Sequence, residues 1–169
     1  IQQTKRLCYA GGVALNVKCN KRLIEYLGPD GELFVQPAAS DAGTALGAAT
    51  YAAHQLGDTI EAMQHAYLGP EYSNDEIEAV LKARGAHYAR CASITDVTAD
   101  LLARGEVVAW FQGQMEFGPR ALGNRSILGD ARNVEMQKKL NLKIKYREGF
   151  RPFAPSVLIE SSKDFFNLP

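Results

Sequence analysis

The sequence predicts an α/β protein whose second part is of the α+β type. Short apolar runs of strand length alternate with amphipathic segments of helical length, and the connections between them are brief. Of the 169 residues, 46% are hydrophobic and 22% are charged, which is ordinary for a globular chain. A segment of weak periodicity, residues 58–72, contains a Gly-Pro pair. We therefore expect two parts, residues 1–57 and 73–169, joined by this linker.

The first part predicts two strands and two helices in alternation. A strand over Leu7–Ala10 is followed by two glycines and then by a helix over Val13–Tyr26. A turn precedes the second strand, Leu33–Val35. The second helix is expected over Ala42–Gln55, with Asp41 as its N-cap and a buried face made mostly of small residues. This order is typical of an α/β layer.

The second part predicts helices and strands with identifiable ends. Ser73 and Ser93 are expected to cap two helices, and Gly105 is expected to end the second of them. An apolar run then predicts a buried strand over Val107–Phe111. The other elements expected here are strands over 87–90 and 156–159 and helices over 74–83, 94–104, 134–144 and 163–166.

A basic segment, residues 112–153, follows that buried strand. It holds nine lysines and arginines against four acidic residues, a net charge of +5 in a chain whose total charge is zero. Pro119 and Gly123 suit the start and the end of a short helical turn, whose unpaired amides attract negative charge. Arginines interleaved with Gly, Pro and Phe therefore predict a site for a phosphate or a carboxylate. The alternative is a set of ordinary surface charges, which we favour for the Lys138-Lys139 pair.

Two shorter patterns have competing interpretations. Gly11 and Gly12 before a helix, with Asn16 one turn later, would let a nucleotide or phosphate approach the backbone, but a plain tight turn also explains them. Asp41 is either a helix cap or a carboxylate ligand for a metal held beside a nucleotide phosphate. The three histidines stand alone in the sequence, and we assign them no role.

Composition sets further limits. The three cysteines are widely spaced and lack a C-x-x-C pattern, so we expect reduced, mostly buried thiols in a cytoplasmic protein without a zinc site. No apolar run reaches transmembrane length, and we expect no membrane partner. The chain opens at Ile1 without an initiator methionine, which indicates a piece of a longer polypeptide. Apolar surface exposed by such a cut would favour a homo-oligomer.

Four segments together resemble a known family. They are Gly11–Asn16 (GGVALN), Ser40–Ala49 (SDAGTALGAA), Gly113–Ser126 (GQMEFGPRALGNRS) and Lys145–Pro155 (KYREGFRPFAP). The series closely resembles the O-carbamoyltransferases of the nodulation (NodU) and antibiotic-tailoring (tobramycin and cephamycin) type. The likeness covers nearly the whole chain, as a C-terminal fragment of such an enzyme.

The resemblance implies a parent protein with two domains. Residues 1–57 are similar to the C-terminal end of an actin/Hsp70-like nucleotide-binding domain, and residues 73–169 are similar to most of a YrdC-like domain. In such enzymes the YrdC-like part takes carbamoyl phosphate and releases carbamate. The actin-like part joins carbamate to ATP as carbamoyl-adenylate and passes the carbamoyl group to a small-molecule hydroxyl. The resemblance also implies a divalent metal, iron or magnesium, at that site.

The resemblance implies roles for individual residues as well. Carbamoyl phosphate would be bound by a set of basic and polar residues, namely Arg120, Asn124, Arg125, Lys145, Arg147 and Arg151. Arg120, Asn124 and Arg125 would be catalytic. Gly11, Gly12 and Asn16 would contact the nucleotide, and Asp41 would be a metal ligand. The central expectation is that the four arginines of this set converge on one small, doubly charged anion.

Two other functions stay open at this stage. An RNA-binding YrdC-like module is the main alternative, because the net positive charge of residues 112–153 would attract the phosphates of RNA. Its aromatic residues lie among Gly and Pro rather than in a stacking array, and the net charge of the chain is zero, so nucleic acid is not the expected partner. An inactive relative with a scaffolding role is the third candidate, and the intact arginine set argues against it. Complete transfer activity is not expected of this chain alone.

Overall fold

The computed structural model describes residues 4–167, and the chain divides into two compact units. The first unit comprises Ile1–Ala86 and Phe111–Ser126, and the second comprises His87–Trp110 and Ile127–Pro169. Helices and two small sheets occur together, which confirms the α/β class. The units are groups of residues in mutual contact, so the domain limits drawn from the sequence stay predictions.

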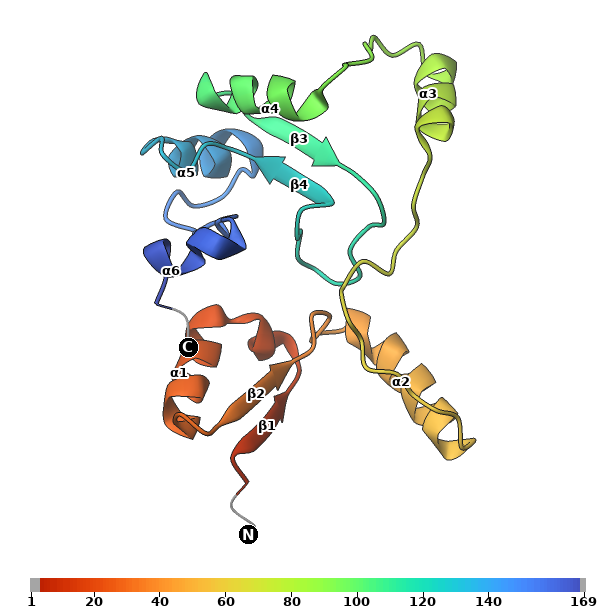
Figure 1. Cartoon of the computed structure of the whole chain (residues 1–169), viewed down its shortest axis with the longest axis vertical. Coiled ribbons are helices and arrows are strands. Elements are labelled where there is room, and N and C mark those ends of the chain that lie inside the picture. The colour runs from red at the N-terminus through yellow and green to blue at the C-terminus, as the bar shows by residue number, and fades with distance from the viewer. Residues whose placement is uncertain (1–3, 168–169) are drawn as a thin grey trace. The chain divides into compact units, whose positions relative to one another are not determined.

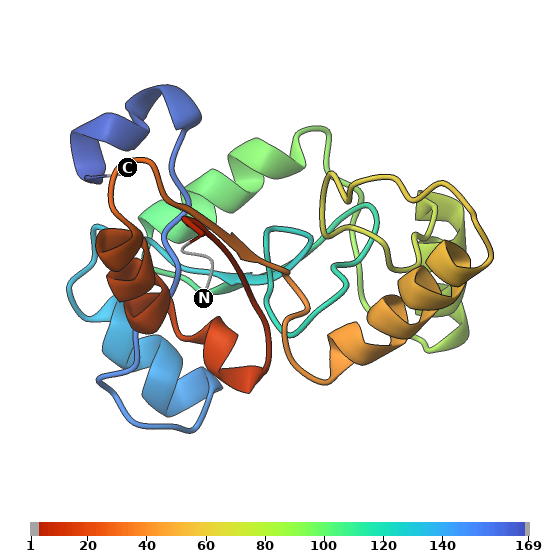
Figure 2. The same cartoon turned by 90° about the horizontal axis from the view of Figure 1, so that it is seen from below.

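A parallel pair of strands forms the sheet of the first unit. Strand β1 (Arg6–Tyr9) pairs with β2 (Glu32–Val35), so that Leu7 lies opposite Leu33. Helix α1 (Val17–Leu27) lies in the crossover between them, because parallel strands cannot be joined by a tight hairpin. Figures 1 and 2 both show α1 beside this sheet. Both strands predicted for this part of the chain are therefore confirmed.

The first predicted helix is interrupted at Asn16. A 3-10 helix, η1 (Gly12–Leu15), comes first, and α1 begins only after Asn16. Asn16 has φ −87° and ψ 97°, and its side-chain oxygen accepts from the amides of Lys18 and Cys19 at 3.1 and 3.2 Å. The residue is an N-cap, so the continuous helix expected over residues 13–26 is wrong.

Helix α2 (Ala42–Gln55) has the predicted bounds but not the predicted burial. None of its residues is buried, and Tyr51 is 67% exposed. Asp41 lies at the N-cap position in helical conformation, and its side chain makes no capping hydrogen bond. Both the buried face and the capping role of Asp41 are therefore wrong. Small residues permit a close approach to a partner, but they do not supply one.

Helix α3 (Asn74–Ala83) begins at the capping box that the sequence predicts. The hydroxyl of Ser73 accepts from the amide of Glu76 at 3.3 Å, and Oε2 of Glu76 accepts from the amide of Ser73 at 2.8 Å. The hydrogen bond from the backbone of Ser73 lowers the pKa of Glu76. Residues 58–72, which precede this helix, contain no helix or strand, and their role as a linker stays a prediction.

A second two-stranded sheet follows helix α4 (Ile94–Ala103). This helix begins at the predicted cap Ser93, whose hydroxyl accepts a helix amide at 3.4 Å, and it stops before Gly105, which has φ +79°. Strand β3 (Val108–Phe111) pairs with β4 (Arg125–Leu128), and their arrows run in opposite directions in Figure 1. Strand β3 is confirmed, but its residues are alternately half-buried and exposed rather than buried throughout.

Two predicted strands, residues 87–90 and 156–159, are not formed. Within residues 4–167, the paired strands are β1 with β2 and β3 with β4, so neither segment is part of a sheet. A 3-10 helix, η3 (Ile159–Ser161), and helix α6 (Ser162–Phe165) end the described chain, and the final helix is confirmed. Strand β4 was not predicted, because its sequence, RSIL, does not alternate between polar and apolar residues.

The predicted amphipathic helix of the second unit is formed, with one irregularity. Helix α5 (Met136–Lys139) continues as a π-helical turn, η2 (Leu140–Ile144). Leu140 is buried as predicted, whereas Ile144 is 41% exposed and Asn141 is completely buried. A π-helical turn contains more residues than an α-turn and so changes which side chains share a face. It therefore moves Ile144 away from the apolar side and brings Asn141 into it.

The cysteines and the apolar helices were the subject of two expectations from composition. All three cysteines are free thiols, but Cys8 and Cys91 are exposed, so the expectation of mostly buried thiols is wrong. Their strands and loops are too thinly covered to bury them. In the part of the chain that the structure describes, no helix has both the length and the apolar character needed to cross a membrane.

Candidate functional site

Residues 112–125 comprise the connection from β3 to β4 and the first residue of β4, and they carry two of the predicted anion-binding arginines. We call them the arginine loop. No helix forms between Pro119 and Gly123, so the predicted helical turn is wrong. Gly118 and Gly123 have φ values of +123° and +110°, which residues with a side chain rarely adopt. The loop is therefore shaped by glycine conformations and by side-chain bonds rather than by helical ones.

Glu116 organises the arginine loop from inside. Its side chain is fully buried, and Oε1 accepts from the amides of Leu122, Asn124 and Arg125 at 2.7, 2.9 and 3.2 Å. Oε2 accepts from Nε of Arg125 at 3.1 Å, and the carbonyl of Glu116 accepts from Nη2 of Arg125 at 2.7 Å. The amide of Leu122, which lies in the predicted turn, is thus directed at an internal carboxylate, together with the two amides of Asn124 and Arg125 that follow the turn.

The carboxyl group of Glu116 is held in its ionised form. Burial acts to raise its pKa, but hydrogen bonds from the amides of Leu122 and Asn124, together with the Arg125 guanidinium, hold the pKa at about 2. Hydrogen bonds to an ionised group are stronger than those between neutral groups. Because the charge is buried, removing its partners would leave it uncompensated, which is strongly destabilising.

Residues 66–69, which belong to the segment predicted as a linker, are hydrogen-bonded to the arginine loop. The amide of Phe117 donates to the carbonyl of Ala66 at 2.7 Å, and the amide of Gly69 donates to the carbonyl of Met115 at 2.8 Å. The hydroxyl of Tyr67 donates to a loop carbonyl, that of residue 122, at 2.8 Å. These bonds join segments about fifty residues apart in the sequence, so the loop has a defined course within the first unit.

Arg120 and Asn124, the other predicted ligands on this loop, have partners within the first unit. Arg120 is exposed, and its Nη2 donates to the carbonyl of Leu15 at 3.3 Å, which joins the loop to η1. Nδ2 of Asn124 donates to the carbonyl of Gln114 at 2.7 Å, and its Oδ1 accepts from Nε2 of Gln112 at 3.3 Å. The amide of Asn124 is thus partly committed to the loop itself.

Arg147 and Arg151 belong to the second unit, where Asn141 holds the loop that carries them. Oδ1 of Asn141 accepts from Nε of Arg147 at 2.7 Å. Its Nδ2 donates to the carbonyls of Gly149 and Arg151 at 3.2 and 2.8 Å. The guanidinium of Arg147 lies 5.0 Å from the centre of the Phe153 ring, within the range of a cation–π contact. The π-helical turn that buries Asn141 therefore also orients Arg147.

Glu148 lies between the same two arginines. Its Oε2 accepts from Nε of Arg151 at 2.8 Å, and this bond lowers the pKa of Glu148, with a smaller contribution from the charge of Arg147. Lys145 is exposed, and its side chain has no hydrogen-bond partner within residues 4–167. Arg147 and Arg151 thus lie on one loop of the second unit. The other two arginines, Arg120 and Arg125, lie on the arginine loop of the first unit. Convergence of all four involves both units and stays a prediction.

The predicted nucleotide contacts lie on an open turn. Gly11 and Gly12 are exposed, and no atom lies within 4 Å of the position that a Cβ would occupy at either. The amide of Gly11 donates to the carbonyl of Ala39 at 2.6 Å, which fixes the turn. Asn16 uses its side-chain oxygen to cap α1, and its Nδ2 donates to no residue that the structure describes. The exposed backbone and this amide group leave room for a polar ligand.

Asp41 offers a single exposed carboxylate. The side chain makes no capping hydrogen bond. Within residues 4–167, no three His, Cys, Asp or Glu side chains are grouped so that they could hold a metal ion. Mg²⁺ and similar ions need several ligands, so the described residues do not fit a complete metal site. The role of Asp41 as a metal ligand stays a prediction.

Two parts of the chain match models of one protein family. Residues 1–50 match a family model described as the carbamoyltransferase N-terminus, and residues 99–169 match one described as the carbamoyltransferase C-terminus. The chain belongs to the carbamoyltransferase family. The match to the C-terminal model includes the arginine loop and the loop that carries Arg147 and Arg151.

Curated relatives align with nearly all of this chain. It is 48% identical to nodulation protein NolNO and 39% identical to nodulation protein U, both of Sinorhizobium fredii. It is also 51% identical to the uncharacterized protein sll1178 of Synechocystis. The alignments cover 98%, 96% and 97% of the chain but 25%, 28% and 28% of these relatives, in that order. The chain thus spans about a quarter of their length.

Two residues of the candidate site were not predicted from the sequence. Glu116 and Asn141 hold the loops that carry the arginines, but neither was predicted as a site residue. Each leaves a signal in the sequence: Glu116 is an acid in a glycine-rich, basic loop, and Asn141 directly follows Leu140 of the apolar helix face. A polar residue at such a position is either unsatisfied or has a specific partner.

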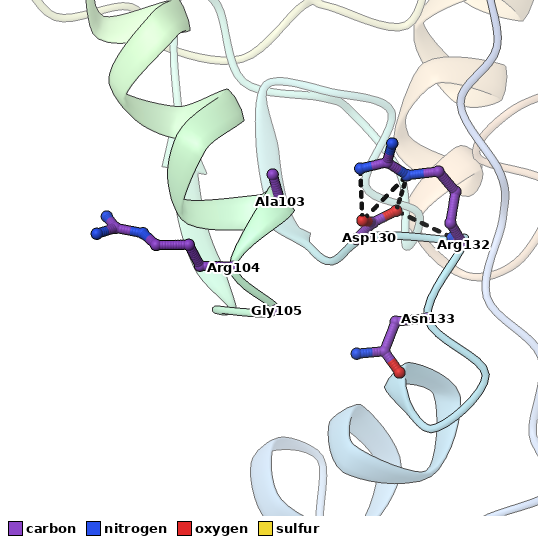
Figure 3. A pocket seen from close by; sticks show the side chains of 6 residues that line it. All are labelled: Ala103, Arg104, Gly105, Asp130, Arg132 and Asn133. Carbon is purple, nitrogen blue, oxygen red and sulfur yellow. Dashed lines mark hydrogen bonds and ion pairs between the residues drawn. The ribbon is translucent and has the colours of Figure 1, made fainter.

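An open hollow of about 450 Å³ lies in the second unit of the chain (Figure 3). Its lining residues are Ala103, Arg104, Gly105, Asp130, Arg132 and Asn133. Arg132 donates from Nη2 to Asp130 at 2.8 Å and from Nε at 2.9 Å, whereas Arg104 points away from this pair in Figure 3. The charge of Arg132 is therefore already balanced by Asp130. This hollow contains none of the predicted site residues, and we do not assign the anion site to it.

Proposed function

We propose that this chain is part of an ATP-dependent O-carbamoyltransferase whose arginine loop binds carbamoyl phosphate. The observation that carries the proposal is the state of Arg125, which lies in the segment matched by the carbamoyltransferase C-terminal model. A buried carboxylate fixes its guanidinium, while 40% of the Arg125 side chain is exposed. A fixed and accessible guanidinium is suited to bind a phosphate group through paired hydrogen bonds.

The proposed reaction has three steps. Water cleaves the linkage between the carbamoyl group and the phosphate, which yields carbamate and inorganic phosphate. A carbamate oxygen then attacks the α-phosphorus of ATP, which forms carbamoyl-adenylate and releases pyrophosphate. The hydroxyl oxygen of a small-molecule acceptor finally attacks the carbamoyl carbon. The acceptor loses its proton, and AMP leaves as the carbamate ester forms.

The chain's basic residues would act in the first of these steps. Arg120, Asn124 and Arg125 would contact the reacting group, and the negative charge on the departing phosphate would be stabilised by the same donors. Lys145 and the arginine pair at Asn141 would complete the binding of the doubly charged anion. These residues are grouped in two loops, and each loop is held by a buried polar side chain, Glu116 or Asn141. This grouping supports the proposal that both loops bind the anion.

The nucleotide would be bound by the other part of the enzyme. In this proposal residues 1–57 are the end of an actin/Hsp70-like domain, and residues 73–169 are most of a YrdC-like domain. Gly11 and Gly12 would approach the phosphates of ATP, and Asn16 would donate through its unused Nδ2. A divalent metal, iron or magnesium, would need ligands besides Asp41, and no step of the proposed reaction is derived through it.

Ligand-induced stabilisation tests the proposal. Carbamoyl phosphate and inorganic phosphate should each raise the melting temperature of the chain, because a ligand that binds only the folded state stabilises it. The double variant Arg120→Ala, Arg125→Ala should lose this rise. The control Arg22→Ala, Arg84→Ala removes two exposed arginines of the first unit and should keep it. An unmutated chain that neither anion stabilises would contradict the proposal.

The alternative, an RNA-binding module, has a different signature. RNA binding should depend steeply on salt, because each phosphate contact releases counterions. Binding of carbamoyl phosphate should instead require the arginine loop specifically and discriminate against anions of other shapes. Salt-dependent retention of the chain on a polyanion column, together with no effect of carbamoyl phosphate on melting, would favour the alternative.

A further inference from the structure

Glu116 contacts Arg125 along one edge of the guanidinium. Nε donates to the carboxylate at 3.1 Å, and Nη2 donates to the carbonyl of Glu116 at 2.7 Å. An arginine has five N–H donors, so the two of Nη1 and the second of Nη2 are left over. One N–H of Nη1 and one of Nη2 form the end-on face of the guanidinium, and the structure gives none of the three donors a partner within residues 4–167. The side chain is 40% exposed, so this face is accessible.

We infer that Glu116 is a positioning residue for anion binding: it fixes the inner edge of Arg125 and so presents the end-on face of the guanidinium to the substrate phosphate. The inference rests on the proposed function. It assigns Glu116 no contact with the anion itself, since its side chain is fully buried. It also assigns the three amides bonded to Glu116 to loop structure rather than to the ligand.

Positioning has a physical benefit that can be measured. A free arginine loses much of its rotational freedom when it binds a ligand, which weakens binding by about tenfold for a side chain of this type. An arginine that is already immobilised avoids most of this loss. Glu116 also places a negative charge next to Arg125, and that charge by itself repels an anion. The two effects have opposite signs, so affinity distinguishes positioning from simple charge compensation.

The variant Glu116→Gln separates these effects. Glutamine has the same shape, and its oxygen can still accept from the loop amides, but its NH₂ group would face the Nε donor of Arg125. Positioning predicts that the variant binds phosphate and carbamoyl phosphate about tenfold more weakly. Charge compensation predicts tighter binding, because one negative charge is gone. The control Glu71→Gln removes the same charge from an exposed position of the first unit and should leave the affinity unchanged.

The measurement is a calorimetric titration of the whole chain with each anion, with the fold of every variant checked by its amide NMR spectrum. A Glu116→Gln variant that is folded and binds as tightly as the parent, or more tightly, overturns the inference and leaves the proposed function standing. A parent chain that binds neither anion overturns the proposed function and, with it, this role of Glu116.

A second measurement needs no variant and covers the case in which Glu116→Gln does not fold. The Nε–H signal of Arg125 should be protected from solvent exchange in the parent chain, both without and with phosphate, because Glu116 keeps this edge throughout. Only the Nη signals should change on titration. Loss of Nε–H protection on adding phosphate would show that the anion displaces Glu116, and it would overturn the inference.

Discussion

The Nε of Arg125 donates to Oε2 of Glu116 at 3.1 Å, and the carboxylate that accepts it is completely buried. The same carboxylate accepts from three backbone amides of the arginine loop. One acidic side chain therefore fixes both a predicted substrate-binding arginine and the course of the backbone around it. The stability of this loop should depend on the charge of Glu116.

Acid should destabilise the chain through Glu116. Its pKa is about 2 in the folded protein, below the ordinary value of about 4.3 for a glutamate in an unfolded chain. The unfolded state therefore binds the proton first. The contribution is fully present above about pH 5 and is lost as the pH falls toward 2. At 1.36 kcal/mol per pKa unit it amounts to about 3 kcal/mol.

Urea unfolding between pH 3 and 7 would measure this contribution. The free energy of unfolding of the parent chain should fall more steeply with acid than that of Glu116→Gln, which has no carboxyl group to titrate at this position. Parallel pH profiles of the two proteins would show that the buried ion pair does not form in solution.

Asn141 should contribute strongly to the stability of the second unit. Replacement by alanine leaves Nε of Arg147 without its acceptor and two carbonyls without their donor. We expect Asn141→Ala to lower the free energy of unfolding by about 2–3 kcal/mol, measured in urea. Asn133→Ala, at an exposed position of the same unit, is the control and should cost less than about 1 kcal/mol.

Asn16 has a structural role that can be separated from its proposed role in nucleotide binding. Asn16→Ala removes the cap of α1 and should cost about 1 kcal/mol of stability. Asn16→Asp keeps an oxygen that can accept from the helix amides, so its stability should match that of the parent. It adds a negative charge and removes the Nδ2 donor, which should abolish ATP binding in a titration. Unchanged ATP affinity in a stable Asn16→Asp variant would show that Asn16 caps the helix and does not bind the nucleotide.

Two glycines should respond in opposite directions to alanine. A Cβ on Gly118 would lie 3.0 Å from the carbonyl oxygen of Pro37, and the residue has φ +123°. Gly118→Ala should therefore lower the free energy of unfolding by about 1–3 kcal/mol and weaken phosphate binding. Gly47 lies within α2 with open space around it, so Gly47→Ala should stabilise the chain by about 0.5–1 kcal/mol. Equal effects of the two changes on thermal or urea unfolding would contradict this account of the loop.

Local sequence signals predicted most of the regular elements correctly. The capping box at Ser73, the cap at Ser93 and the glycine that ends α4 at residue 105 act between neighbours in the chain, so the sequence alone specifies them. The same kind of reasoning failed for residues 87–90 and 156–159. A strand needs a partner, and a short apolar pattern does not show whether one is available.

The sequence by itself determined which residue types the candidate site would contain: arginines set among glycines and prolines, in motifs that resemble those of carbamoyltransferases. Only the tertiary structure decided how they are held. Glu116 folds back onto Arg125, residues 66–70 bind the same loop, and a π-helical turn buries Asn141 against Arg147. The physical reason is that a buried charge or amide is stable only where specific partners surround it. Those partners come from backbone amides and carbonyls, which every sequence contains and which only folding brings into place.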